Sequence, residues 1–399
     1  MIPSQERSSA GLGAHSSLFS MALKLPLPAE FFHCPVLAPV EDEHLKQHAV
    51  QTAMDVVHKT HLSGDIQWTL RCEDQDDMFI YRGHDPASPP GAYLYMSVME
   101  VMGTLDEVIQ LFQTRTTAQA KAHAQRFGKQ LLDAVKLYSL VEPTCDAPTE
   151  SIGVTWRAYR SPLSLFVAKR DACTVDCTHA FTLDGRPGWV SSSKSVTLSC
   201  CPELTHLAGF VRMINYGSGH VFLESATRPG YIELRYIAQL DFRGTSFNFV
   251  SDAVLKRREW VSDINMTKRC RNLLDIDRFL REDRLRVGVL LEENQLVPKA
   301  ARKHCYVCTV RFGWNQHKSN CYKCGQVVCS NCNSDWCLAG QEGNTRTFKA
   351  CVKCAMVPAN RHVSGSFSSG TSSVTHVSDA CWDFSQDLRS SATCAAILT

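Results

Sequence analysis

Four cysteine pairs decide the fold of the C-terminal part of the chain: CYVC at 305–308, CYKC at 321–324, CSNC at 329–332 and CVKC at 351–354. A two-residue spacer lets one turn present both thiolates to the same metal ion, and two such pairs complete a tetrahedral zinc site. Eight thiolates with this spacing therefore predict two zinc ions. Because four protein ligands close each site, the zinc is predicted to be structural and not hydrolytic.

The short gap between the second and third pairs predicts how the pairs combine. Only four residues separate Cys324 from Cys329, so joining the first pair with the third and the second with the fourth interleaves the two sites. One predicted ligand set is Cys305, Cys308, Cys329 and Cys332, and the other is Cys321, Cys324, Cys351 and Cys354.

The whole segment resembles FYVE zinc fingers, with Phe312 four residues after the second cysteine and Gly325 directly after the fourth. Membership of that family implies binding of phosphatidylinositol 3-phosphate by a basic motif, RRHHCR, around the third cysteine. Here residues 317–322 read HKSNCY, and Lys349 stands where the family has an arginine. The resemblance therefore implies His317, Lys318 and Lys349 as phosphoinositide-binding residues, with lysine lacking the bidentate grip of arginine.

Trp314 falls at the tip of the loop that members of this family insert into the bilayer. Tryptophan suits the boundary between apolar and aqueous layers, so Trp314 is predicted to insert into a membrane. Residues 301–356 hold eight lysines and arginines against two acids, a net charge of +6, whereas the whole chain carries only +2. A basic module attached to an acidic body favours an anionic surface as its partner. The alternative is that Trp314 packs internally and the basic residues are only solvated.

Composition limits the class of protein. With 399 residues, the chain is long enough for two or three domains. Hydrophobic residues at 44% and charged residues at 21% are typical of globular proteins. We expect no nucleic-acid partner. The N-terminus lacks the apolar core of a secretory leader, so the expected location is cytoplasmic and the 19 cysteines are not expected to form disulfides. No motif for a phosphate loop, zinc protease or nucleophile elbow was found, so the chain is not predicted to be an enzyme.

The region before the cysteines predicts an α+β domain. Helical spacing marks 41–61, and alternation marks strands at 66–70, 78–80 and 93–102. A helix is predicted to start with Thr104 as its cap, with Val108, Leu111 and Phe112 facing inward, and a second helix is predicted at 117–132. Strands return at 135–141, 154–159 and 163–183, and Asp184 and Gly185 are predicted to form a hairpin turn. From Tyr231 to Phe242 every second residue is apolar, and 247–274 again has helical spacing. The run YGSGH at 216–220, with two glycines and no following lysine, predicts a turn.

This order of elements, over residues 40 to 275, resembles the START family, whose helix-grip fold wraps a curved antiparallel sheet around a long C-terminal helix. The resemblance implies a hydrophobic lipid ligand in a cavity between the sheet and the last helix. Proposed inward residues are Met96, Val98, Leu234, Tyr236 and Trp260, with Glu100 as a buried polar anchor.

Five segments are predicted in all. They are a disordered N-terminus (1–20), a START-like lipid-binding domain (21–275), a linker (276–298), a FYVE-type cross-brace finger (299–357) and a disordered Ser/Gly/Thr-rich tail (358–399). The leading hypothesis is a non-enzymatic lipid-binding protein, a peripheral membrane adaptor or lipid carrier at endosomal phosphoinositide membranes. Two alternatives remain open: a protein scaffold that binds no lipid, and a RING-like ubiquitin ligase.

Overall fold

The computed structural model describes residues 24–74, 77–114, 116–127, 131–160, 168–243, 252–314, 316–339 and 345–356. The predicted disordered segments at 1–20 and 358–399 lie outside these ranges. None of the described helices combines the length and the apolar character that crossing a bilayer requires.

The predicted helices and strands occur in the predicted order, and the structure adds elements between residues 186 and 224 that the sequence analysis did not assign. The α-helices are α1 (Pro39–Lys59), α2 (Leu105–Phe112), α3 (Thr117–Arg126), α4 (Thr205–Ala208), α5 (Asp252–Arg271), α6 (Leu273–Arg286) and α7 (Val352–Met356). The strands of the large sheet are β1 (Gln67–Asp74), β2 (Met78–His84), β3 (Tyr93–Met102), β4 (Leu131–Val141), β5 (Ser151–Tyr159), β6 (Arg170–Leu183), β7 (Arg186–Ser195), β8 (Val211–Arg212), β9 (Ile214–Glu224) and β10 (Tyr231–Asp241).

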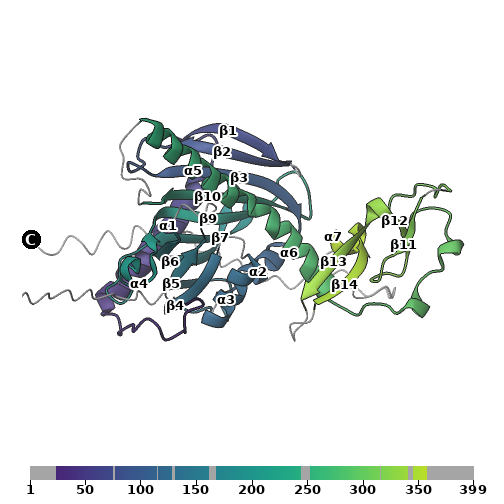
Figure 1. Ribbon diagram of the computed structural model, residues 1–399, viewed down its shortest axis with the longest axis horizontal. Coiled ribbons are helices and arrows are strands. Elements are labelled where there is room, and N and C mark those ends of the chain that lie inside the picture. The colour runs from purple at the N-terminus through teal and green to yellow at the C-terminus, as the bar shows by residue number, and fades with distance from the viewer. Residues whose placement is uncertain are drawn as a thin grey trace, which may run out of the picture.

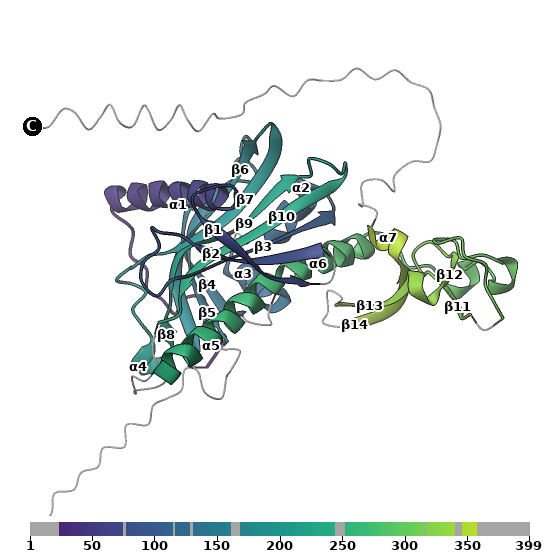
Figure 2. The ribbon, with the colours of Figure 1, turned by 90° about the horizontal axis from the view of Figure 1, so that it is seen from above.

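The large sheet runs in the order β1-β2-β3-β10-β9-β7-β6-β5-β4, with β8 beside β6. All neighbours along this path are antiparallel, and α1 packs on β6, β7 and β9 from one face. Helix α5 packs on β3 and β10 from the other face and continues toward the C-terminal module (Figure 1; Figure 2). The predicted α+β class, an antiparallel sheet gripping a long C-terminal helix, is confirmed.

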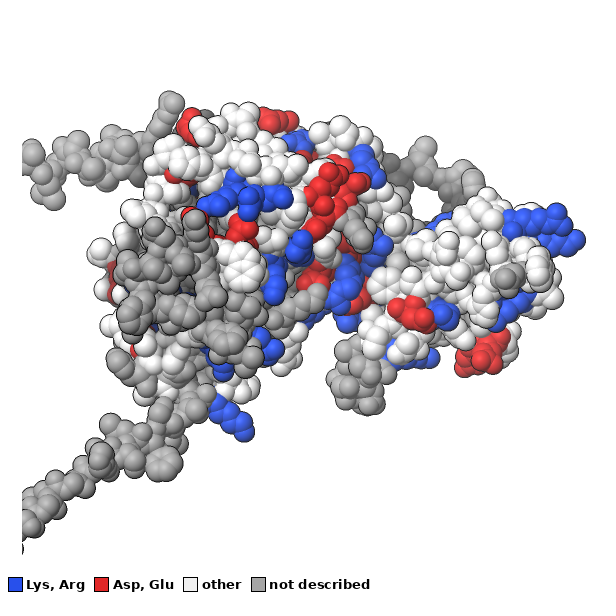
Figure 3. All heavy atoms as spheres, turned by 45° about the horizontal axis from the view of Figure 1, so that its top comes forward, with Lys and Arg blue, Asp and Glu red and all other residues white. Residues whose placement is uncertain are grey.

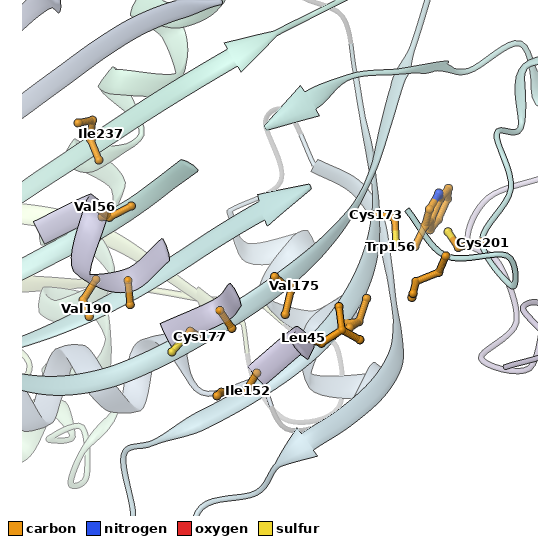
Figure 4. Close-up of a cluster of buried hydrophobic side chains, with 14 of the residues drawn as sticks. Leu45, Val56, Ile152, Trp156, Cys173, Val175, Cys177, Val190, Cys201 and Ile237 are labelled. Carbon is orange, nitrogen blue, oxygen red and sulfur yellow. The ribbon is translucent and has the colours of Figure 1, made fainter. Parts of the chain in front are cut away.

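The core is divided between the two faces of the sheet. On β10, Leu234 and Tyr236 join the cluster under α5 and α6, whereas Ile237 joins the cluster under α1. This division follows the period of two along a strand. In the α1 cluster, the Trp156 ring lies between Cys173 and Cys201 (Figure 4).

Three boundaries differ from the prediction. The helix expected to reach residue 132 ends at Arg126, and β4 begins at Leu131. The strand expected from residue 163 begins at Arg170, with 161–167 outside the described residues. Alanine-rich and leucine-rich stretches favour helices locally, so only pairing with β5 reveals that Leu131 belongs to a strand.

The run at 216–220, interpreted as a turn, lies inside strand β9. Glycine is required at position 219 because a side chain would clash with neighbouring elements, and not because the chain turns there. A Cβ on Gly219 would lie 2.7 Å from the Ser191 carbonyl oxygen and 2.9 Å from Cγ1 of Val56 on α1. The turn interpretation was therefore wrong, because glycine in a strand can mark a close approach of neighbouring elements.

The terminal helix extends further than expected. Helix α5 ends at Arg271, and α6 follows almost directly, so helical structure continues to Arg286. Within the predicted linker, Ile276, Phe279 and Leu280 are buried in the cluster on the α5 face of the sheet. The first part of this segment therefore belongs to the core of the sheet domain and is not a free connector.

Beyond α6 the chain forms a small module with two hairpins. Strands β11 (Lys318–Asn320) and β12 (Val327–Cys329) form one hairpin, and β13 (Asn333–Ala339) and β14 (Thr345–Cys351) form the other. The short 3-10 turns η2 (Glu293–Gln295), η3 (Lys299–Ala301) and η4 (Ser330–Cys332) complete it. We name this module the finger.

Candidate functional site: a two-metal finger with an exposed tryptophan

The eight predicted cysteines converge in two groups of four. One group holds Cys305, Cys308, Cys329 and Cys332, and the other holds Cys321, Cys324, Cys351 and Cys354. Within each group the sulfur atoms all lie within 4.8 Å of one another. The structure thus brings the thiols together in the interleaved grouping expected from the sequence.

The sulfur geometry fits zinc. With Zn–S bonds of about 2.3 Å, the sulfur atoms at the corners of a tetrahedron are about 3.8 Å apart. The Sγ atoms of Cys308 and Cys329 are 3.8 Å apart, and the two cross-pair distances in the other group are 3.9 Å and 4.0 Å. Four thiolates per ion also leave no open position for a catalytic water.

Two similar turns build the thiol pairs at 305–308 and 321–324. The amide of Thr309 donates to the carbonyl oxygen of Cys305 at 2.9 Å, and the amide of Gly325 donates to that of Cys321 at 2.8 Å. Both Thr309 (φ 60°) and Gly325 (φ 73°) adopt the left-handed conformation, which glycine enters with least strain. This conformation gives a physical reason for the glycine directly after the fourth cysteine.

Backbone amides also point at the sulfur atoms. The amide of Cys329 donates to Cys305 Sγ at 3.4 Å, and that of Cys351 donates to Cys321 Sγ at 3.2 Å. Each bond joins two pairs of the same group. Such contacts orient the ligands and favour their charged form, as groups around a metal site commonly do.

The loop between the first two cysteine pairs carries an exposed tryptophan. The amide of Phe312 donates to the Lys303 carbonyl, and a turn follows in which the Gln316 amide donates to Gly313 at 3.2 Å. Trp314 lies in this turn and is fully exposed, at 102%. Internal packing of Trp314, the alternative considered from the sequence, does not occur in this structure.

The predicted phosphoinositide residues do not lie in equivalent surroundings. His317 is exposed directly after the turn, whereas Lys318 is turned inward. Nζ of Lys318 donates to the carbonyl oxygens of Lys299 at 3.2 Å and Arg302 at 2.8 Å, and lies 5.0 Å from the centre of the Phe312 ring. Lys318 therefore contributes to the folding of the finger.

Lys349 is also engaged. On the β13–β14 hairpin it faces Asp335 in register, and Nζ of Lys349 lies 3.0 Å from Oδ2 of Asp335. The charge of Lys349 is thus partly neutralised by the neighbouring carboxylate. Lys349 also lies on a different hairpin from Trp314.

Sequence reasoning missed Lys303 and His304 as neighbours of the tryptophan turn. His304 and Arg311 form an isolated bridge, so the strand entering the loop lies against the one that reaches Trp314. Lys303, His304 and Arg311 are all exposed. The signal in the sequence would have been the basic pair Lys303 and His304 directly before the first cysteine pair, because the hairpin around that pair returns the chain to Arg311 beside them.

Inside the sheet domain, polar side chains line the face toward α5. Arg157 makes two hydrogen bonds of 2.9 Å to the two carboxylate oxygens of Asp176. Arg269 of α5 lies 4.6 Å from the centre of the Tyr159 ring, and His220 lies 4.6 Å from that of Tyr236. Arg157 and Asp176 keep 22% of their side-chain surface accessible although they lie in the interior.

Most residues expected to line the interior lie elsewhere. Leu234 and Tyr236 do face α5, but Trp260 is 58% exposed on the outside of α5. On β3 the residues that contact the α5 cluster are the odd-numbered Tyr95, Met99 and Val101, so Met96, Val98 and Glu100 point to the opposite face. The Glu100 carboxylate pairs with Ser225 and Arg228 there. Sequence alternation identified the strand but not which face was inward.

Comparisons with known proteins agree with these two parts. The family model of the FYVE zinc finger matches residues 295–359. No curated protein sequence matches the chain.

Among solved structures, human StAR-related lipid transfer protein 5 is similar at 17% identity, covering 60% of this chain and 99% of that chain with a TM-score of 0.43. The lipid transfer and protein localization domain of human StarD13 is similar at 14% identity, covering 61% of this chain and 96% of that chain with a TM-score of 0.38. Residues 295–359 of this protein thus match the FYVE zinc finger and hold two groups of four cysteines that fit two zinc ions, and they follow a domain in which an antiparallel sheet grips a long C-terminal helix.

Proposed function

We propose that this protein is a non-enzymatic, peripheral membrane protein that binds phosphoinositide-containing membranes through its finger and a hydrophobic lipid through its sheet domain. Its expected place is the cytoplasmic face of endosomal membranes, where it acts as an adaptor or lipid carrier. The domain boundaries remain those predicted, with part of the 276–298 segment assigned to the sheet domain.

The observation that carries the proposal is the exposure of Trp314. A fully exposed tryptophan in a protruding turn suits the interface of a bilayer, where the ring is buried and the indole N–H stays near water. Exposed apolar atoms without a partner are otherwise unfavourable in water. Strand β11, which begins four residues after Trp314, lies at the end of the finger away from the sheet domain (Figure 1), so a membrane could approach this end without obstruction by that domain.

The charge around the turn supports an anionic membrane. Lys303, Arg311 and His317 are exposed, and within the described ranges none of them has an ion pair. Basic side chains also gather at the outer end of the finger (Figure 3). Each cationic side chain near an anionic leaflet contributes about 1 kcal/mol. We therefore assign headgroup contact to Arg311, Lys303 and His317 first, and to Lys318 and Lys349 only after their internal contacts open.

The sheet domain would hold its lipid between the sheet and α5. Apolar side chains from β3 and β10 line one part of this face, and the Arg157–Asp176 pair lies in another. A largely apolar interior with a few converging polar groups is the usual form of a small-molecule site. A hydrophobic ligand with one polar end would suit this arrangement.

The test of the finger is sedimentation with vesicles of neutral lipid containing either phosphatidylinositol 3-phosphate, the other phosphoinositides or phosphatidylserine. We expect Trp314→Ala to reduce binding at least tenfold, because one buried tryptophan is worth roughly 2 kcal/mol. Trp260→Ala is the matched control, since Trp260 is also exposed but lies on the sheet domain. Equal losses for both variants, or none for Trp314→Ala, would contradict the proposal.

Charge variants separate the headgroup contacts. Arg311→Gln should lower vesicle binding several-fold while leaving the thermal stability unchanged. Lys318→Ala should instead lower the stability of the finger, because its Nζ caps two backbone carbonyls. If no vesicle binds, the finger is a protein-docking module, the scaffold alternative. An autoubiquitination assay tests the RING-like alternative, for which we expect no product.

A further inference from the structure

The end of α6 is built into the finger. Leu285 of α6 is buried in the cluster that contains Ala355 of α7 and cysteines of both metal groups, Cys305, Cys321, Cys332 and Cys351. The other end of α6 lies in the core of the sheet domain through Ile276 and Phe279. One rigid helix therefore has its two ends in two different cores.

Arg284 joins the two parts at this point. Its side chain is only 2% exposed, and it pairs with both oxygens of Glu107, from Nε at 2.8 Å and from Nη2 at 3.0 Å. Nη2 also donates to the Met102 carbonyl at 2.7 Å. Glu107 closes the first turn of α2 by accepting from the Thr104 amide, so Arg284 holds the sheet domain at β3 and α2.

The remaining donors of Arg284 bind the finger. Nη1 donates to the carbonyl oxygens of Ala355 at 3.4 Å and Met356 at 3.1 Å, which end helix α7. Helix α7 contains Cys354, a ligand of the second metal group. A buried guanidinium whose donors are all satisfied makes strong and directional hydrogen bonds. Its removal leaves the partner carboxylate buried without its counter-charge, which strongly destabilises the folded protein.

A second contact joins the same metal group to the end of α6. Lys323 lies between Cys321 and Cys324, and its Nζ donates to the carbonyl oxygens of Val287 at 2.8 Å and Gly288 at 3.3 Å. These carbonyls lie just beyond the last residue of α6, where a cation is favourable. The Leu291 amide also donates to the carbonyl oxygen of Tyr322 at 2.8 Å.

The first metal group shares this buried cluster but differs in its polar contacts. Cys305 and Cys308 lie in the hairpin closed by the His304–Arg311 bridge, directly before the turn that carries Trp314, and Cys329 and Cys332 lie at the two ends of η4. The hydrogen bonds that join α6 to the finger, from Arg284 to Ala355 and Met356 and from Lys323 to Val287 and Gly288, all lie beside the second metal group and not in the segments 303–314 or 327–334. Strands β11 and β12 lie at the far end of the finger, whereas α7 adjoins α6 (Figure 1; Figure 2).

We infer that the two zinc sites have separate roles: the Cys321/Cys324/Cys351/Cys354 site locks the finger to the sheet domain through Arg284 and Lys323, and the Cys305/Cys308/Cys329/Cys332 site shapes the Trp314 loop. Loss of zinc from the locking site loosens α6, and with it α2, in the sheet domain. Helices α5 and α6 cover the face of the sheet where the lipid is proposed to bind. Loss of zinc from the finger therefore lowers the stability of the proposed lipid-binding domain. The lock itself does not depend on membrane binding.

The test is hydrogen exchange followed by mass spectrometry on the full chain with both zinc ions bound, comparing Arg284→Gln with Arg281→Gln. Arg281 is the matched control, since it lies on α6 but pairs within that helix with Asp277. In Arg284→Gln we expect at least tenfold faster exchange in α2 and α7, with two zinc ions per chain retained. Unchanged exchange in α2 and α7, or equal acceleration by Arg281→Gln, would overturn the lock.

A second pair of variants separates the two sites. Cys354→Ser should accelerate exchange in α6 and α2, whereas Cys308→Ser should accelerate it in the Trp314 loop and leave α2 unchanged. Zinc content and exchange are measured together, so a variant whose whole finger unfolds is recognised by loss of both ions. If Cys308→Ser accelerates α2 as much as Cys354→Ser does, the division of roles is wrong.

Discussion

The sheet domain and the finger are held together by different means. On the α1 face alone the sheet domain buries large side chains such as Trp156 and Phe210, and a second cluster fills the other face. In the finger, four of the ten buried residues of the core are cysteines of the metal groups, and another, Leu285, is supplied by α6. A module this small cannot bury enough apolar surface, so the metal replaces a core.

Zinc removal gives the largest expected effect. Binding of a structural zinc ion supplies about 10–16 kcal/mol, so a strong chelator should unfold β11 to β14. The central strands β9 and β10 should stay protected, because their cores contain no metal ligands. Hydrogen exchange before and after chelation measures both regions. Loss of protection in β10 on the same timescale would mean that the sheet domain also depends on metal.

Trp156→Ala should produce the opposite pattern. Its ring is fully buried and its Nε1 donates to Asp171 at 2.9 Å, so the variant should lose about 3–5 kcal/mol of stability in urea unfolding. The zinc content should remain two per chain. Trp260→Ala, at a largely exposed position, is the control and should change stability by less than about 0.5 kcal/mol.

Acid sensitivity is a further difference inside the sheet domain. Burial, together with a smaller effect of nearby His123, lowers the pKa of His220 from 6.5 to about 3. Burial and the guanidinium groups of Arg157 and Arg126 lower the pKa of His123 from 6.5 to about 3. The unfolded chain binds these protons first, so stability falls as pH falls from about 6.5 toward 3.

Between pH 6 and pH 5, the two histidines together should cost about 2 kcal/mol of unfolding free energy. His220→Phe keeps the ring contacts with Phe112 and Tyr236 and should remove about half of that loss. Urea midpoints at the two pH values measure it. A variant with the same pH slope as the parent protein would show that His220 is not held neutral by burial.

The smallest expected effect concerns the cap of α2. Thr104 accepts from the Glu107 amide, and Thr104→Ala should cost about 1 kcal/mol. Thr116→Ala removes the same kind of cap from α3, which lacks the Arg284 contact. If the contacts of Arg284 with Glu107 strengthen the α2 cap, Thr104→Ala should lower the thermal unfolding temperature more than Thr116→Ala does. Equal effects would mean that the Arg284 contacts stabilise α6 but not the α2 cap.

Local chemistry made some features predictable. The capping box at Thr104 and the alternation along β10 were both evident, because helix caps and strand pleats depend on residues within a few positions. The turn at Asp184 and Gly185 was predicted for the same reason, and both residues have positive φ. The role of Gly219 was not evident, because the space it leaves is filled by Val56 of a distant helix.

The candidate site likewise combines features that the local sequence determines with features that depend on distant parts of the chain. The sequence by itself determined the two zinc ions and the grouping of the thiols, since ligand type and spacing are local properties. Only the tertiary structure decided that Lys318 and Lys349 are engaged and that Arg311 and Trp314 face solvent. It alone placed Arg284 beside Glu107, 177 positions earlier in the chain, and beside Met356, 72 positions later. Such contacts follow from the packing of whole elements, which no short stretch of sequence encodes.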